Sequence, residues 1–200
     1  MKLIVISPPG ADPREVPALE AMLASGLGRY HVRKPEWTAE EVERWILSLP
    51  EAWRGHLVLH GHPDTAHALG LAGSHRRDEA GPHVDGEVSR SCHDLAGLKR
   101  EMAAFPQVIF GPVFPSISKA GHGPDPLIAW DELPEVLSGA GRCLVVAVGG
   151  ITAGRVARCR ELGFGGVAAI GAIWGAENPL EAFIELRDAA ARQTGRLHAA

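Results

Sequence analysis

The chain has 200 residues, of which 46% are hydrophobic and 22% charged, and its formal net charge at pH 7 is −4. This length suits one domain and is sufficient to bury a core without disulfides or a structural metal. The acidic balance argues against a nucleic-acid partner and against an anionic membrane surface, because both favour a basic face.

Cys92, Cys143 and Cys159 form no paired motif, which is typical of reduced thiols in a cytoplasmic protein. The apolar run at the N-terminus is too short for a signal peptide. No stretch reaches the roughly 18 apolar residues that a membrane span requires. We therefore expect a soluble, cytoplasmic protein without a membrane partner.

Short β-rich segments alternate with helical segments along the chain. The predicted strands are residues 2–7, 30–33, 56–59, 73–75, 88–91, 108–110, 144–148 and 167–170. The predicted helices are residues 15–27, a segment starting after Thr38, 65–69, 94–104, 152–162 and 179–192. Thr38 and Glu41 have the spacing of a capping box, Thr152 is expected to cap the helix that follows it, and Pro179 suits a first helical turn.

Strands that alternate with helices predict a parallel sheet, and the apolar segment 143–148 is typical of a parallel strand buried on both faces. Eight such units favour a single compact (β/α)8 TIM-barrel domain over residues 1–200, at the lower length limit of that fold. A flavodoxin-like or Rossmann sheet is the alternative, and the lack of GxGxxG after the first strand disfavours its dinucleotide-binding form. Residues 76–87 and 116–126 are predicted loops.

Glycines at the ends of the last two predicted strands indicate a phosphate site. Gly149 and Gly150 end the seventh strand, and Ile170 and Gly171 end the eighth. Glycine lets a ligand approach the backbone closely, and a helix that follows offers free N–H groups to an anion. Phosphate sites in barrels commonly use these two loops. The alternative is that Gly149 and Gly150 merely make a tight turn.

A polar segment leaves the sixth predicted strand, where Ser116, Ser118 and Lys119 offer two hydroxyls and an ammonium to phosphate oxygens. Residues 111–119, GPVFPSISK, resemble the motif GPVFPTxTK of the thiamine phosphate synthase and thiazole tautomerase family. Residues 148–151 (VGGI) and 169–173 (AIGAI) are similar to the family's next two strand ends. Residues 91–93 (SCH) resemble its SxH, and residues 31–34 (HVRK) stand where it has QxRxK.

The resemblance covers most of the chain and implies a transferase that joins hydroxymethylpyrimidine pyrophosphate to thiazole phosphate. The products are thiamine phosphate and pyrophosphate, and the implied cofactor is Mg²⁺. By position, the resemblance implies that the thiazole phosphate is held by Ser116, Ser118, Gly149, Gly150, Ile170 and Gly171. It implies that Arg33, Ser91 and Lys119 hold the pyrophosphate and act in catalysis.

The chain departs from the family pattern at the metal site. The family's Asn-Asp pair, whose Asp binds Mg²⁺, is replaced by His60 and Gly61, and the second acidic position aligns only loosely with Asp78. The family's strand-two lysine is replaced by Pro35, with Lys34 one residue earlier. Imidazole is a poor ligand for a hard cation such as Mg²⁺.

Two interpretations of this departure stay open. In the first, Arg76 and Arg77 supply the positive charge that Mg²⁺ would have brought to a synthase. In the second, the chain is a thiazole tautomerase-like isomerase or a non-catalytic binder of thiazole phosphate. The tautomerase branch has a histidine where Pro112 stands, and His122 in the adjoining loop is the candidate replacement.

A third hypothesis rests on the histidines alone. His60 and His62 are two residues apart, and His31 and His75 are predicted to lie near the same barrel mouth. An HxH pair on one strand faces one side and can bind zinc, as in barrel hydrolases. His31, His60 and His62 are therefore further pocket candidates, and Lys34 and His122, raised by the resemblance, are added to them. A homodimer is also a candidate, because helical shells of barrels often pair.

Overall fold

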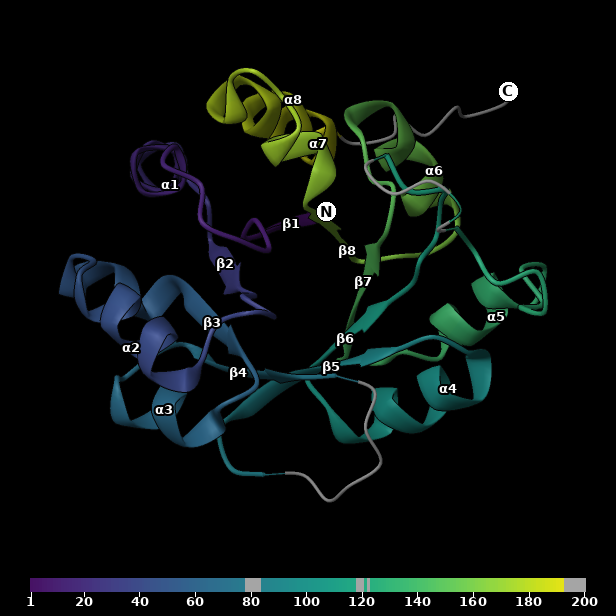
Figure 1. Ribbon diagram of the computed structural model, residues 1–200. Coiled ribbons are helices and arrows are strands. Elements are labelled where there is room, and N and C mark those ends of the chain that lie inside the picture. Colours follow the sequence, from purple (N-terminus) through teal and green to yellow (C-terminus); the bar gives the residue numbers. More distant parts are fainter. Residues whose placement is uncertain (78–83, 118–120, 122, 193–200) are drawn as a thin grey trace.

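The computed structural model describes residues 1–77, 84–117, 121 and 123–192 (Figure 1). Strands β1 to β8 close into a barrel in sequence order, and every neighbouring pair is parallel. The predicted (β/α)8 barrel is confirmed, and the alternative of an open doubly wound sheet is wrong. The strands are β1 (Lys2–Ile6), β2 (Arg29–Val32), β3 (Leu57–His60), β4 (Gly73–Arg76), β5 (Glu87–Cys92), β6 (Gln107–Phe110), β7 (Leu144–Val148) and β8 (Gly166–Ala169).

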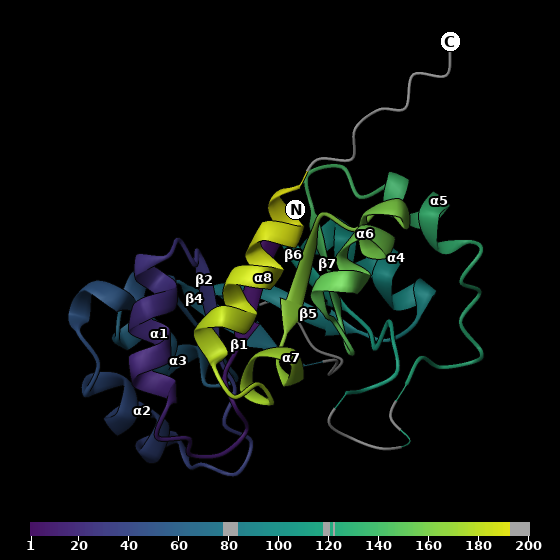
Figure 2. The same cartoon turned by 90° about the horizontal axis from the view of Figure 1, so that it is seen from above.

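Helices surround the barrel, and the last one, α8, lies beside α1 and α6 (Figures 1 and 2). The α-helices are α1 (Glu15–Ala24), α2 (Ala39–Leu47), α3 (Pro63–Ala68), α4 (Leu95–Ala104), α5 (Leu133–Ser138), α6 (Val156–Glu161), α7 (Gly171–Trp174) and α8 (Pro179–Ala191). Two 3-10 segments are η1 (Glu51–His56) and η2 (Ala153–Arg155). The N-terminal ammonium donates to the Ala190 carbonyl at 2.8 Å, which joins both ends of the barrel domain.

The predicted helix start at Thr38 is confirmed. The Thr38 side chain accepts from the Glu41 backbone N–H, and the Glu41 carboxylate accepts from the Thr38 N–H at 2.8 Å. Thr152 is the N-cap residue of η2, which leads into α6, but its side chain makes no capping hydrogen bond. The predicted loop at 76–87 is shorter than expected, since its two end residues belong to β4 and β5.

The barrel interior is apolar on one side and polar on the other. Ile4, Ile6, Ile109, Val146 and Ala168 form an apolar cluster on β1, β6, β7 and β8. Residues that are paired on neighbouring strands point to the same side of the barrel. The pairs are Ile6 with His31, His60 with His75, His75 with Ser89, and Ser91 with Ile109, so the inward side of β2 to β5 carries polar side chains. The inward positions of β2 to β5 therefore include three imidazoles and two hydroxyls, alongside the apolar Val58.

The three cysteines are free thiols. Cys92 and Cys159 are buried, and burial raises the pKa of the Cys159 thiol to about 11. A thiol with such a pKa is inert as a nucleophile at neutral pH. Among the described residues, no helix combines the length and apolar character that crossing a membrane requires.

Candidate active site

Two cavities open at the C-terminal ends of the strands, and Arg33 lines both. The first, of ≈ 260 Å³, lies over β7 and β8 and is called the glycine cavity. Its lining includes Arg33, Ser116, Gly149, Gly150, Ile170 and Gly171. The second, of ≈ 400 Å³, lies over β2 to β5 and is called the histidine cavity. Its lining includes Arg33, His60, His62, His75, Arg77 and Glu87.

The glycine cavity is shaped by close backbone packing between the turn after β7 and the segment after β6. Gly149 and Gly150 have φ values of +93° and +60°, where side chains are disfavoured. A Cβ at Gly149 would lie 2.6 Å from the Pro112 Cβ. The Val113 N–H donates to the Val148 carbonyl at 2.9 Å, which holds the two segments together. Glycine is therefore required here for packing as well as for the turn.

Two further contacts fix the rim of the glycine cavity. The Arg155 guanidinium donates to the carbonyls of Gly150 at 2.6 Å and Pro115 at 3.3 Å. The Trp174 indole donates to the Ile6 carbonyl at 2.8 Å, which anchors α7 to the end of β1. These contacts hold Gly150 and Gly171, on neighbouring loops, in fixed places around one concave site.

The histidine cavity is positively charged. The Arg33 guanidinium is half-buried, and burial together with the charge of nearby Arg77 lowers its pKa. Within the part of the chain that the structure describes, neither of these two guanidinium groups has an ion-pair partner. The carboxylate of Glu87, by contrast, lies 2.5 Å from Arg76 and 3.8 Å from Arg90. Two cations in one pocket suit a polyanionic ligand.

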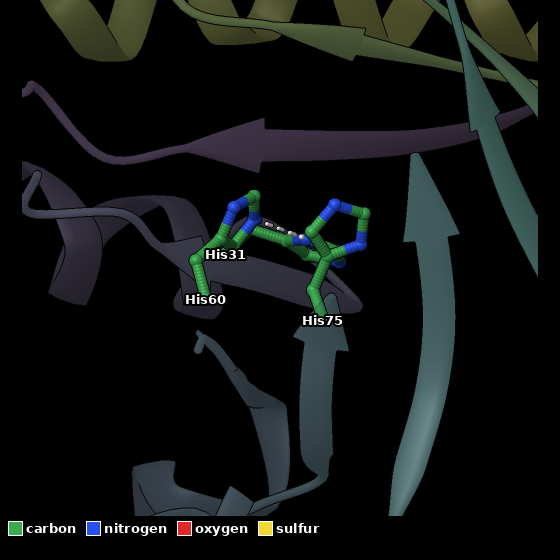
Figure 3. A group of neighbouring side chains, drawn as sticks. All are labelled: His31, His60 and His75. Carbon is green, nitrogen blue, oxygen red and sulfur yellow. Dashed lines mark hydrogen bonds between the residues drawn. The ribbon is translucent and has the colours of Figure 1, made fainter. Parts of the chain in front are cut away.

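Below these cations, three histidine side chains meet inside the barrel (Figure 3). Nδ1 of His31 lies 3.0 Å from Nε2 of His60, and the His60 and His75 rings are 4.2 Å apart between centroids. Both ring nitrogens of His75 bond hydroxyls, Nδ1 to Ser89 and Nε2 to Ser91, each at 2.8 Å. Nε2 of His31 is buried and has no hydrogen-bond partner among the described residues.

Burial keeps all three imidazoles neutral at pH 7. It lowers the pKa of His31 and His60 well below the ordinary value, and neighbouring histidines lower both further. It lowers the pKa of His75 to about 3, with added repulsion from Arg33 and Arg77. Neutral imidazoles can donate and accept hydrogen bonds or bind a metal ion.

Residues 3–173 match the family model described as thiamine monophosphate synthase. The chain belongs to this family. It is 30% identical over 203 residues to the thiamine-phosphate synthase of Synechococcus sp. (strain WH7803), covering 94% of this chain and 56% of that relative. It is 28% identical over 190 residues to the thiamine-phosphate synthase of Chromobacterium violaceum, covering 88% of this chain and 89% of the relative.

A solved structure of similar fold agrees with this family assignment. The thiamine phosphate pyrophosphorylase from Bacteroides thetaiotaomicron has a TM-score of 0.77 and 27% identity, covering 95% of this chain and 98% of that one. The resemblance of the sequence motifs to the thiamine phosphate synthase family is thereby confirmed. Members of the family named thiamine-phosphate synthase are transferases, and the chain is a member of this transferase family.

Five predicted phosphate-site residues of this family member, Ser116, Gly149, Gly150, Ile170 and Gly171, lie around the glycine cavity. Arg33 is between the two cavities, and the Ser91 hydroxyl is bonded to His75 inside the barrel. The predictions for Asp78, Ser118, Lys119 and His122 fall outside the described residues.

His62 and Lys34 line the histidine cavity as predicted, but the structure changes how each is interpreted. The pairing of His60 with His62 is wrong, because β3 ends at His60 and the strand alternation ends with it; His62 is exposed, with a left-handed φ of 48°, and precedes α3. The charge of Lys34, by contrast, is engaged away from the cavity. Its ammonium is buried 2.5 Å from the Glu15 carboxylate and donates to the carbonyls of Pro8 and Gly10.

Of the two arginines suggested to supply the charge of Mg²⁺, Arg76 pairs with Glu87, whereas Arg77 has no ion-pair partner among the described residues. Sequence reasoning missed Ser89, a fully buried partner of His75. A signal for it was present, because residues two apart on a strand share a face and Ser91 was already a candidate.

The donors present in the histidine cavity do not fit Mg²⁺. This hard cation prefers carboxylate, carbonyl and water oxygens in octahedral geometry. In the described lining, the one carboxylate is Glu87, which is engaged by Arg76 and Arg90. The remaining metal-binding groups are imidazoles, which suit borderline transition metals.

Proposed function

We propose that this chain is a thiamine-phosphate synthase that joins hydroxymethylpyrimidine pyrophosphate to thiazole phosphate. Family membership supports the reaction. The observation that supports this location for the reaction is a pair of cavities that share Arg33 in their walls. Two phosphorylated substrates must meet in this reaction, and a cation between two anion sites can serve both.

The glycine cavity is the proposed site of the thiazole phosphate. Its backbone at Gly149, Gly150 and Gly171 is open to close approach, and the half-buried Arg33 guanidinium faces it as a cation. Charge-assisted hydrogen bonds from arginine are well suited to phosphate oxygens. The hydroxyl of Ser116 lies in the same wall.

The histidine cavity is the proposed site of the pyrimidine pyrophosphate. The bond between the pyrimidine methyl carbon and the pyrophosphate oxygen breaks, and its electron pair leaves with pyrophosphate. The thiazole nitrogen then donates its lone pair to the carbon and completes the new C–N bond. Negative charge develops on the departing oxygen, so the main task of Arg33 and Arg77 is electrostatic stabilisation in a partly desolvated pocket.

A coupled assay of both substrates tests this proposal directly. We expect the parent protein to form thiamine phosphate, and Arg33→Gln to lower kcat/KM roughly 10²- to 10³-fold, as loss of one well-placed donor does. Arg142→Gln is the matched control, because Arg142 is exposed in the loop before β7, at the opposite end of the strands. Parent-like turnover by Arg33→Gln would contradict the assigned role.

The same assay separates the synthase from a second candidate, a thiazole tautomerase-like isomerase or non-catalytic binder. The observation favouring this alternative is the unsuitable donor set for Mg²⁺. It predicts binding of thiazole phosphate, measured by calorimetry, with no pyrophosphate released at any Mg²⁺ concentration. The resemblance implies that the synthase requires Mg²⁺, and the dependence of pyrophosphate release on the Mg²⁺ concentration tests this requirement.

Cellular location and assembly complete the proposal. The three free cysteines are compatible with a reducing cytoplasm. A homodimer stays a prediction, to be tested by light scattering of the purified chain.

A further inference from the structure

The cluster of His31, His60 and His75 is built from three neighbouring strands. The side chains come from β2, β3 and β4 and turn inward, and one nitrogen of each lies within 4.8 Å of the others (Figure 3). His31 and His75 are 0% and 1% exposed. Rigid strands fix such a constellation better than loops do.

We propose that His31, His60 and His75 bind one borderline divalent transition-metal ion, with Zn²⁺ as the reference ion. Nitrogens bound at about 2.0–2.1 Å to a tetrahedral ion lie about 3.3 Å apart. The nitrogens of His31 and His60 are 3.0 Å apart, and the third histidine is within 4.8 Å. Small rotations of the side chains therefore bring all three into coordination distance.

The protonation state favours coordination. Metal binding requires imidazole in its neutral form. Burial lowers the pKa of each of these three histidines, so no proton has to be displaced from them at pH 7.

The surroundings of the cluster resemble the support of a metal site. Histidine ligands commonly bond a second group through the nitrogen that does not bind the metal, which fixes the ring. His75 has a serine at each nitrogen, so either nitrogen can bind the ion while a serine still holds the other. Among the residues that the structure describes, Nε2 of His31, the nitrogen that does not contact His60, is buried and has no partner. Buried polar atoms are seldom left unpaired, and such exceptions occur at functional sites.

The proposed ion has three protein ligands and one open position. His60 and His75 line the histidine cavity, whereas His31 lies beneath it, so the open position faces that cavity. Three protein ligands with a free position are typical of catalytic rather than structural zinc. The positive charges of Arg33 and Arg77 disfavour a bare cation, but they favour an anionic oxygen as its fourth ligand.

Metal binding can be measured without any substrate, so this test is independent of the proposed reaction. The full chain, freed of any affinity tag and dialysed against a chelator, is titrated with Zn²⁺ against a chromophoric competitor. Co²⁺ is added to a second sample, because tetrahedral Co²⁺ absorbs visible light strongly. We expect one ion per chain by elemental analysis and a Kd tighter than micromolar.

Variants of two ligands and one exposed histidine decide the location. His31→Gln and His60→Asn should each weaken Zn²⁺ binding at least 100-fold and abolish the Co²⁺ spectrum. His67→Gln should bind as the parent does, because His67 is exposed and outside the cluster. Circular dichroism and the thermal unfolding midpoint verify that each variant is folded. A parent protein that binds less than 0.1 ion per chain, or a folded His31→Gln variant with parent affinity, would overturn the proposal.

Discussion

At the scale of single residues, the buried ion pair of Lys34 and Glu15 contributes to stability rather than to the site. Both side chains are almost fully buried, and the Tyr30 hydroxyl donates to the second Glu15 oxygen at 2.7 Å. Removing one member of a buried pair leaves an uncompensated charge. We expect Lys34→Met to lower the free energy of unfolding by about 3–5 kcal/mol, measured by guanidinium denaturation.

Two comparisons make this prediction specific. The double variant Lys34→Met with Glu15→Leu should regain most of the loss, because no charge is then left buried. Arg158→Ala removes an ion pair with Glu161 in which both side chains are more than half exposed, and it should change stability by less than about 1 kcal/mol. Equal stability of Lys34→Met and the parent would show that the pair is dispensable.

Arg33 and Lys34 follow the end of β2 at Val32 and have different surroundings. Arg33 lines both cavities, whereas the Lys34 ammonium pairs with the Glu15 carboxylate. Because both residues lie beyond the strand, alternation could not assign the direction of either side chain from the sequence. The partner Glu15 could not be predicted, because it comes from α1 and its distance from Lys34 depends on how α1 packs against β2.

At the scale of elements, predictability followed the strength of each local pattern. β7 was predicted to the residue, because five consecutive apolar residues are typical of a buried parallel strand. α5 was missed, since its six residues include Pro134 and are too few for a helical period to be visible. α7 has four residues and is shorter still. These short helices owe their formation to packing on the barrel rather than to intrinsic propensity.

The turn after β7 allows a sharp test of element packing. Gly149→Ala places a Cβ 2.6 Å from the Pro112 Cβ at a φ of +93°, which side chains disfavour. We expect a loss of roughly 1–3 kcal/mol in unfolding free energy and weaker thiazole-phosphate binding, measured by denaturation and calorimetry.

Gly154→Ala is the matched control for this turn. Gly154 lies in η2 on the same connection, its φ is not positive, and a Cβ added there would have no atom within 4 Å. The stability and ligand affinity of this variant should equal those of the parent within error. If Gly149→Ala behaved in the same way, the close packing of the two loops would not matter for the glycine cavity.

At the scale of the whole molecule, the barrel interior combines an apolar half with a polar half, and only the first could be predicted. Apolar inward positions of β1, β6, β7 and β8 follow from strand patterning. The meeting of His31, His60 and His75 depends on the registers of three strands and on where β3 ends. The sequence indicated a histidine group at the mouth but included His62, which lies beyond the strand.

The polar half also predicts how the metal-free protein responds to acid. The unfolded chain protonates its histidines near pH 6.5, whereas His75 in the folded state stays neutral down to a pKa of about 3. Between these values the unfolded state binds more protons, so stability falls as pH falls. Each such histidine contributes a loss of about 1.4 kcal/mol per pH unit well below pH 6.5.

Guanidinium denaturation of chelator-treated protein at pH 7.5, 6.5 and 5.5 measures this loss. We expect His75→Gln to show a shallower decline than the parent, because one buried neutral imidazole is gone. His67→Gln should retain the parent slope, since His67 is exposed on α3 and lies outside the buried cluster. Identical slopes for the parent and His75→Gln would mean that the interior histidines are protonated without unfolding, and water would then have to reach the barrel interior. A parent slope steeper than that of His75→Gln would instead establish the dry, neutral imidazole layer that distinguishes this half of the barrel from the apolar half.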